Sequence, residues 1–181
     1  MANPIRLEQG VVILTAPNGG GKTTLLRTMA SIALLHQCGL YVPAQTATVP
    51  RYTAIYLRSG ANDSQLARMS SFACEMRDMA VVMRTVGCLA LIDEPCRGTS
   101  THEGLALLTA IIDELSPTIT AVFSTHYHEL QPTRQVVNLQ LGARVSGVQC
   151  LPDYTVRAGR CVRSHALHLA IAVGLPIEVV R

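Results

Sequence analysis

The stretch Gly10–Thr24, GVVILTAPNGGGKTT, decides how the rest of the chain is interpreted. Its first six residues form a short apolar run, which is typical of a buried parallel strand. A glycine-rich loop over residues 16–21 follows, and Thr23–Cys38 then has apolar residues at helical spacing. The stretch therefore predicts a strand, a tight loop and a helix in direct succession.

The loop matches the phosphate-binding pattern G-x-x-x-x-G-K-[ST], in which backbone N–H groups and a lysine surround nucleotide phosphates. Ala16 stands where the pattern has its first glycine, and its methyl group is expected to crowd the loop only at positive φ. We expect ATP phosphates to bind here. The predicted binding residues are Ala16, Pro17, Asn18, Gly19, Gly20, Gly21, Lys22, Thr23 and Thr24.

Lys22 is the one lysine among the 15 basic residues of the chain, the others being arginines. A compact ammonium fits among phosphate oxygens in a way that a planar guanidinium does not. We expect Lys22 to reach the β- and γ-phosphates and the Thr23 hydroxyl to ligate Mg²⁺.

A second motif, Cys88–Glu94 (CLALIDE), is an apolar strand that ends in two carboxylates. Ligands of open α/β sheets bind at the carboxyl ends of strands. Asp93 is expected to hold Mg²⁺ through water, and Glu94 to orient and deprotonate an attacking water. The competing interpretation is a helix-capping acid before Pro95. Downstream of a phosphate loop, the carboxylate pair favours a hydrolase over a nucleotide kinase.

His126 ends a third motif, Ser124-Thr-His126, after another apolar run. A histidine at a strand end can contact a γ-phosphate, so His126 is our third predicted catalytic residue, with Lys22 and Glu94. A zinc cluster of His126, His128 and Glu129 is disfavoured because no thiol or carboxylate set at ligand spacing accompanies them.

The remaining pattern alternates strands and helices, which predicts a single α/β domain over residues 1–181, with a mostly parallel sheet and helices on both faces. Further strands are expected at 52–57, 118–124, 136–141 and 154–157, and helices at 70–86, 104–115, 164–173 and 176–181. No run reaches the roughly 18 apolar residues of a membrane span. Six scattered cysteines without a CxxC pair favour a reducing intracellular compartment, the nucleus or an organelle included. The net charge of +3 does not by itself indicate nucleic-acid binding.

Thr15–Thr24, Asp93–Gly104 and Ser124–Leu130 together resemble the ATPase domain of the MutS family of DNA mismatch-repair proteins. Gly39–Ala44 and Gly174–Pro176 are similar to further family segments, so the resemblance covers nearly the whole chain. It implies a three-layer, ABC-like P-loop NTPase fold and ATP hydrolysis that drives mismatch recognition and repair. The triple glycine, Cys96–Gly98 and Gly159–Cys161 look closer to organelle-type homologues.

The resemblance also implies a partner. Ser70–Met76 looks like the family's signature segment, in which Ser70 would contact a γ-phosphate bound by the opposite subunit. A homo- or heterodimer through the ATPase face follows, with Gly98–Thr101 at the same interface.

Several features depart from the family. Arg68 and Met69 stand where a small residue is usual, and the adenine-stacking aromatic expected upstream of Asn3 is missing. The mismatch-binding, connector, lever and clamp domains and the C-terminal helix-turn-helix are also missing, so DNA is an expected partner only in their context.

Two alternatives stay open. One is a nucleotide-dependent dimerisation module with little or no turnover, which Ala16, Arg68 and the missing aromatic favour. The other is a related ABC or chromosome-maintenance ATPase, which the lack of an LSGGQ-like signature disfavours.

Overall fold

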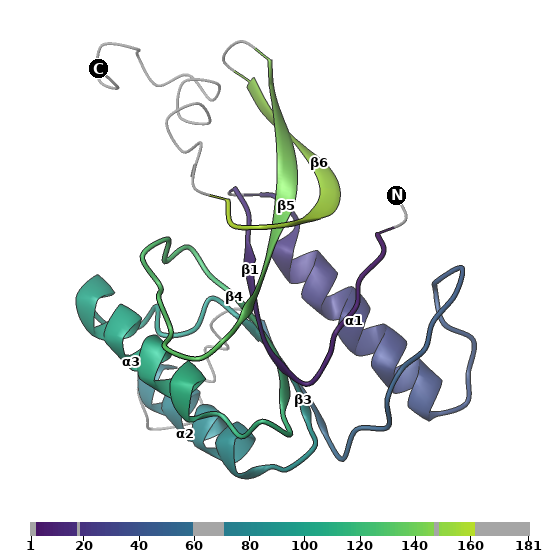
Figure 1. The fold of residues 1–181 in the computed structure, drawn as a ribbon, viewed down its shortest axis with the longest axis horizontal. Helices are drawn as coiled ribbons and strands as arrows, with labels where there is room; N and C mark the ends of the chain where they lie inside the picture. Colours follow the sequence, from purple (N-terminus) through teal and green to yellow (C-terminus); the bar gives the residue numbers. More distant parts are fainter. Residues whose placement is uncertain (1–2, 18, 60–70, 147–148, 162–181) are drawn as a thin grey trace.

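The computed structural model describes residues 3–17, 19–59, 71–146 and 149–161, which form a sheet flanked by helices (Figure 1). The strands are β1 (Gly10–Thr15), β2 (Ile55–Arg58), β3 (Leu89–Asp93), β4 (Thr120–Ser124), β5 (Val137–Ser146) and β6 (Gln149–Ala158). The helices are α1 (Lys22–Gln37), α2 (Ser71–Arg84) and α3 (Thr101–Glu114).

The sheet has the strand order β2-β3-β4-β1-β5-β6. All neighbours up to β5 pair in parallel, and β6 returns antiparallel along β5. In Figure 1 the β5–β6 hairpin extends past the ends of the other strands. Because β1 lies between β4 and β5, the phosphate loop that follows β1 begins near the middle of the sheet.

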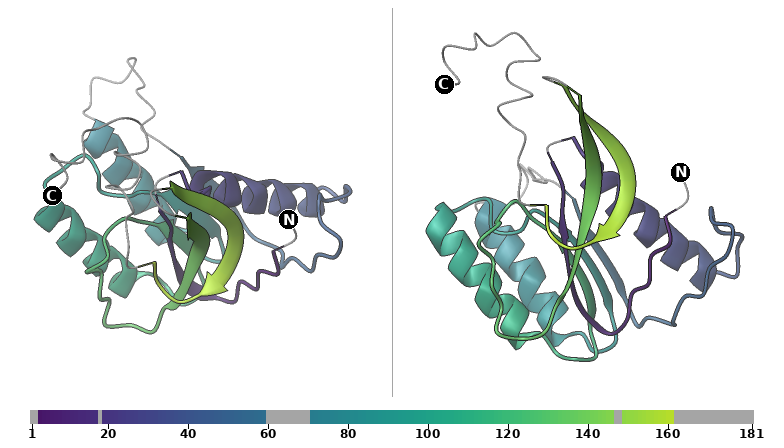
Figure 2. Two further views of the ribbon diagram at one scale, coloured as in Figure 1. Left: turned by 90° about the horizontal axis from the view of Figure 1, so that it is seen from above. Right: turned by 45° about the horizontal axis from the view of Figure 1, so that its top comes forward.

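The two faces of the sheet carry separate apolar clusters. Val11 and Ile13 point into one cluster with Met79 of α2 and Leu108 of α3. The alternate residues of β1 pack on the other face, in a cluster that contains Leu26 of α1. This period of two is expected of strands buried on both sides. The helices therefore cover both faces, α1 on one and α2 with α3 on the other (Figure 2).

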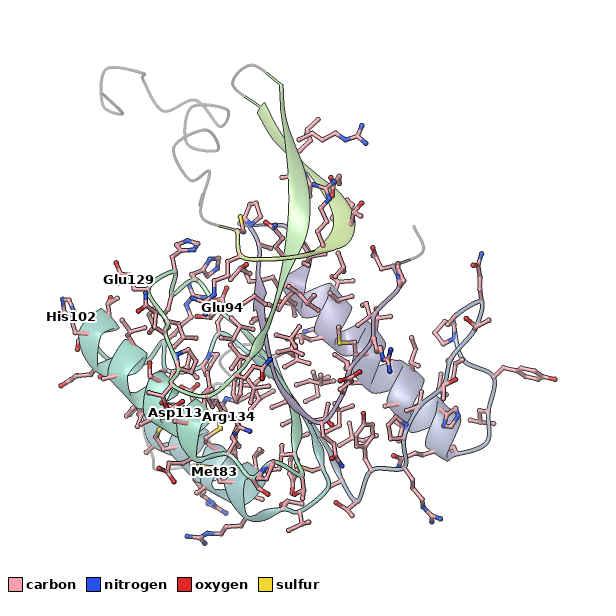
Figure 3. All side chains as sticks on the ribbon, viewed as in Figure 1. Met83, Glu94, His102, Asp113, Glu129 and Arg134 are labelled. Atoms are coloured by element: carbon pink, nitrogen blue, oxygen red, sulfur yellow. The ribbon has the colours of Figure 1, made fainter. Side chains whose placement is uncertain are left out.

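The segment between β4 and β5 is tied to the end of α3 by hydrogen bonds. Asp113 Oδ1 accepts from the backbone amides of Thr133 and Arg134, and the Arg134 guanidinium donates to the carbonyls of Ile112 and Leu115 (Figure 3). The Arg134 side chain thus donates to carbonyls at the end of α3, where the last turn of a helix leaves carbonyls without intrahelical partners.

The predicted α/β fold, with a mostly parallel sheet and helices on both faces, is confirmed. Helix α3 begins at Thr101 rather than Gly104 because the Ser100 side chain caps it by accepting from the Glu103 amide. The two short strands expected at 136–141 and 154–157 are parts of ten-residue strands. The predicted helices at 164–173 and 176–181 lie outside the described residues. Among the described helices, none is long and apolar enough to cross a membrane.

Candidate active site

The predicted motifs meet at one edge of the sheet, beyond the carboxyl ends of β1, β3 and β4. The register pairs Asp93 of β3 with Ser124 of β4, and Leu14 of β1 with the same serine. The phosphate loop, the carboxylate pair and the histidine therefore follow neighbouring strand ends, where Figure 3 labels Glu94. This is the edge at which open α/β sheets bind ligands.

The glycines give the phosphate loop its shape. Gly19 and Gly21 have φ values of 71° and 89°, which side-chain-bearing residues rarely adopt. The Gly20 amide donates to the Pro17 carbonyl at 3.0 Å, and a Cβ on Gly20 would lie 2.8 Å from that same oxygen. Any larger residue at position 20 would have to push the loop open.

Ala16, the departure from the phosphate-loop pattern, is buried without a left-handed backbone. The residue is 2% exposed, and the described non-glycine residues with positive φ are Glu94, Cys96 and Tyr154. The Ala16 methyl lies 3.0 Å from the place that a Cβ on Gly20 would take. The loop therefore accommodates the methyl in the space that Gly20 leaves.

A pocket of about 290 Å³ lies between this loop and the ends of β3 and β4. Its lining combines residues of the loop and the start of α1 with the ends of β3 and β4, and it includes all three predicted catalytic side chains: Gly19, Gly20, Gly21, Lys22, Thr23, Thr24, Glu94 and His126. The three residues that the sequence singles out for catalysis thus surround a single pocket.

Glu94 is the centre of a charged cluster in that pocket. Its Oε1 lies 2.5 Å from His126 Nε2 and 3.5 Å from Lys22 Nζ, while Oε2 pairs with Arg97. The hydrogen bond from His126, helped by the nearby cationic charges, lowers the pKa of Glu94 to about 2. Burial lowers the pKa of Lys22. Glu94 is therefore a carboxylate at neutral pH and is engaged on both oxygens.

Asp93 accepts hydrogen bonds from two hydroxyl groups. Thr23 Oγ1 donates to Oδ2, and Ser124 Oγ donates to Oδ1. The two side chains expected to hold Mg²⁺ thus converge from the start of α1 and the end of β3. Hydroxyl and carboxylate oxygens are ligands of the hard kind that Mg²⁺ takes, so these residues fit the ion.

A second, larger cavity of about 1040 Å³ adjoins the phosphate loop and shares Gly20, Gly21 and Thr24 with the smaller pocket. One wall is α1, and the others come from residues 3–7, residues 43–50 and the hairpin. Apart from the phosphate-loop residues, these walls carry no predicted ligand-binding role, because they are distant along the chain and no motif connects them.

Tyr154 stands where this cavity meets the phosphate loop. Its ring lies 3.3 Å from the place that a Cβ on Gly21 would take. Tyr154 has a φ of 54°. Asn3 holds the strand just after it, donating to the Tyr154 carbonyl at 2.8 Å and accepting from the Val156 amide at 3.0 Å. An aromatic ring therefore borders the loop, although it comes from β6 rather than from upstream of Asn3.

Comparison with known proteins agrees with this arrangement. Residues 12–181 match the family model for MutS domain V. The chain belongs to the MutS family.

Curated MutS proteins match nearly the whole chain. It is 35% identical to the DNA mismatch repair protein MutS of Lactobacillus johnsonii over 189 residues, which cover 99% of the chain and 22% of that protein. Identity to the MutS of Thermus aquaticus is 37%, covering 98% and 23%, and to that of Shouchella clausii 38%, covering 95% and 21%. The chain thus spans about a fifth of the length of these bacterial relatives. The closer likeness to organelle-type MutS homologues stays a prediction.

The described part of this MutS-family chain contains most of the predicted site residues, and it brings Lys22, Thr23, Asp93, Glu94 and His126 together. Asn18 and the predicted trans-acting Ser70 lie outside the described residues. No group of three or more metal-ligating His, Cys, Asp or Glu side chains occurs in the portion that the structure describes. Tyr154 was not predicted as a site residue, because the sequence indicates its strand but not its place beside Gly21.

Proposed function

We propose that this chain is the ATPase module of a MutS protein, which binds ATP with Mg²⁺ and hydrolyses it to drive DNA mismatch recognition and repair. The convergence of Lys22, Asp93, Glu94 and His126 on the phosphate loop is the observation that carries the proposal. The strand order, with β1 between β4 and β5 and the loop directly after β1, supports a three-layer, ABC-like P-loop NTPase fold.

The groups around the small pocket support the binding of phosphate there. The start of α1, which lines this pocket together with the glycines of the loop, favours an anion, because the first N–H groups of a helix lack intrahelical partners and the helix dipole is positive at that end. Lys22 lies 3.5 Å from Glu94 and is held among the same side chains. Phosphate oxygens would compete with Glu94 for Lys22 and so leave Glu94 Oε1 in contact with His126 alone.

The metal site would use Thr23 and Asp93, whose oxygens already converge. Bound Mg²⁺ would supply charge neutralisation at the transferred phosphoryl group. Ser124 keeps the Asp93 carboxylate oriented by donating to its other oxygen.

Glu94 would act on the attacking water. A carboxylate with a pKa of about 2 is a weak base, because proton abstraction is best served by a pKa near the working pH. In the conformation described here, Glu94 therefore suits orientation of the water more than its deprotonation. Loss of the contact with Lys22 would raise the pKa of Glu94 and strengthen it as a base.

The large cavity would hold the nucleoside, with Tyr154 beside the base or sugar. The cavity shares Gly20, Gly21 and Thr24 with the phosphate pocket, as would be expected if one nucleotide occupied both. An aromatic contact with the nucleoside would then come from the hairpin.

Partners follow from family membership and stay proposals. We propose a homo- or heterodimer through the ATPase face, with Ser70 acting on the partner's nucleotide, and contact with mismatched DNA through other domains of a full-length MutS. A reducing intracellular location, the nucleus or an organelle included, is likewise a prediction.

The test separates binding from turnover. Glu94→Gln should retain MgATP binding and lose about 100-fold or more in hydrolysis, since loss of the group that orients or deprotonates the attacking water costs about that much. Lys22→Ala should lose both, and Glu114→Gln, an exposed carboxylate at the end of α3, serves as the matched control. Unchanged hydrolysis in both site variants would refute the ATPase assignment. Binding without hydrolysis in the unaltered protein would favour the dimerisation module.

A further inference from the structure

The turn that carries Glu94 has an unusual backbone. Glu94 has a φ of 50° and Cys96 a φ of 64°, so two non-glycine residues within three positions adopt left-handed conformations. L-residues populate this region sparsely and stay there only where the surrounding structure fixes them. The turn therefore needs specific contacts to hold Glu94 in place.

The first contacts come from β4 and act on Glu94 itself. Its amide donates to the Ser124 carbonyl at 3.0 Å and lies 3.2 Å from Ser124 Oγ. These bonds fix the start of the turn. They leave Cys96, the second left-handed residue, to be fixed by other groups.

Glu75 of α2 supplies the contact to Cys96. Its Oε1 accepts from the Cys96 amide at 2.8 Å, and both residues are buried, at 6% and 0% exposed. A buried amide that loses its acceptor is strongly disfavoured, and a hydrogen bond to a carboxylate is stronger than one to a neutral oxygen. The Glu75 side chain thus directly stabilises the left-handed backbone conformation at Cys96.

The opposite side of Cys96 is also engaged. Its carbonyl accepts from the Tyr127 hydroxyl at 3.1 Å, one residue beyond His126. On α3, a Cβ at Gly104 would lie 2.4 Å from that hydroxyl and 2.7 Å from the Cys96 carbonyl oxygen. The helix therefore leaves room for this pair only because position 104 is glycine.

We propose that Glu75 is a positioning residue for Glu94: by binding the Cys96 amide, it holds the turn that directs the Glu94 carboxylate toward Lys22 and His126. The proposal rests on the proposed ATPase function. Without the acceptor, the turn relaxes towards ordinary backbone conformations, and Glu94 leaves the position in which its Oε1 lies 2.5 Å from His126 Nε2. Glu75 itself lines neither the pocket nor the larger cavity.

The experiment compares steady-state ATP hydrolysis and MgATP affinity in four variants of the full chain. Glu75→Ala is expected to lower kcat by about 10- to 100-fold, the scale of a small misplacement of a catalytic group, with the affinity for MgATP within about twofold. Glu75→Gln keeps an acceptor oxygen at the same reach and should retain kcat within about threefold. Glu75→Asp withdraws the carboxylate by one methylene and should give an intermediate loss. Glu114→Ala, at an exposed carboxylate at the end of α3, should change nothing.

Amide hydrogen exchange at Cys96 gives a readout independent of catalysis. Exchange should accelerate in Glu75→Ala and stay slow in Glu75→Gln, because the amide loses its buried acceptor in the first variant only. If Glu75→Ala does not fold, Glu75→Asp provides the same comparison with a smaller change in volume and no change in charge.

The outcomes separate this proposal from the one it rests on. Unchanged hydrolysis in Glu94→Gln defeats the proposed function. If Glu94→Gln is inactive while Glu75→Ala and Glu75→Asp turn over normally, the positioning role alone is wrong. Equal losses of kcat in Glu75→Ala and Glu75→Gln would also overturn it, because that result indicates an effect of the Glu75 charge. A parallel loss of MgATP affinity and kcat would overturn it as well, because that result indicates a general structural effect.

Discussion

The two ends of the proposed nucleotide site are built in different ways. The phosphate end takes its groups from three short motifs that follow adjacent parallel strands, and its side chains contact one another directly. The nucleoside end is a cavity between segments more than 100 residues apart, closed by Asn3 and Tyr154. Chemistry at the first end depends on residue type, whereas binding at the second depends on how the hairpin lies against the rest of the domain.

This difference predicts that substitutions at the two ends affect different kinetic constants. Changes at the phosphate end should lower turnover, because those groups act on the charge that develops during reaction. Changes at the nucleoside end should weaken binding with little effect on turnover, since uniform binding of substrate and transition state raises affinity alone.

The largest effect is expected from Asp93→Ala. This substitution removes the carboxylate that accepts from Thr23 and Ser124 and that would hold Mg²⁺. Loss of the metal removes several kcal/mol of charge stabilisation, so kcat should fall about a thousandfold. ATP hydrolysis measured across a Mg²⁺ titration provides the check, with Glu114→Ala, at an exposed carboxylate at the end of α3, as the control. A variant that regained full turnover at high Mg²⁺ would show that Asp93 only tunes metal affinity.

A smaller effect, on binding, is expected from Tyr154→Ala. Base–aromatic stacking contributes about 1–3 kcal/mol, so the Kd for ATP should rise about 5- to 100-fold while kcat stays within about threefold. Tyr154→Phe keeps the ring and places a similar side chain on the same left-handed backbone, so its affinity for ATP should be normal. A fluorescent ATP analogue would measure the affinities. If kcat fell as much as affinity, the distinction between the two ends would not hold.

The contrast also explains what the sequence predicts well. A phosphate loop, a strand ending in Asp93–Glu94 and a strand followed by His126 are local patterns, and parallel pairing brings strand ends to one edge without further information. The convergence of Lys22, Glu94 and His126 could therefore be expected before any coordinates.

The groups that the sequence analysis missed depend on contacts distant in the chain. Nothing local indicates that Tyr154 lies beside Gly21, because the register of the β5–β6 hairpin and the reach of Asn3 set its place. Glu75 looked like part of a signature segment, and its bond to Cys96 depends on how α2 packs beside the end of β3. Pairwise packing of this kind is not encoded in periodicity or in motif spacing.

A third prediction concerns acid stability at the phosphate end. The pKa of Glu94 is depressed from its usual 4.5 to about 2, chiefly by the hydrogen bond with His126. Its folded-state interactions therefore stabilise the protein above pH 4.5, and this contribution is lost as the pH falls towards 2. Urea unfolding of the wild type and of Glu94→Gln should show a shallower pH dependence in the variant between about pH 5 and 3. Parallel curves would mean that Glu94 is not held by these partners in solution.

The smallest effect is expected from Ala16→Gly, which restores the glycine of the general pattern. Ala16 has no left-handed backbone to relieve, and its buried methyl occupies the space beside Gly20. ATP affinity and kcat should therefore change by less than about twofold, while the added freedom of the unfolded chain lowers stability by about 0.4–1 kcal/mol. Nucleotide titration and urea unfolding measure the two quantities. A tenfold gain in turnover would instead show that the Ala16 methyl slows catalysis. That result would strengthen the case for a module that binds ATP with little or no hydrolysis, because Ala16 is one of the departures on which that alternative depends.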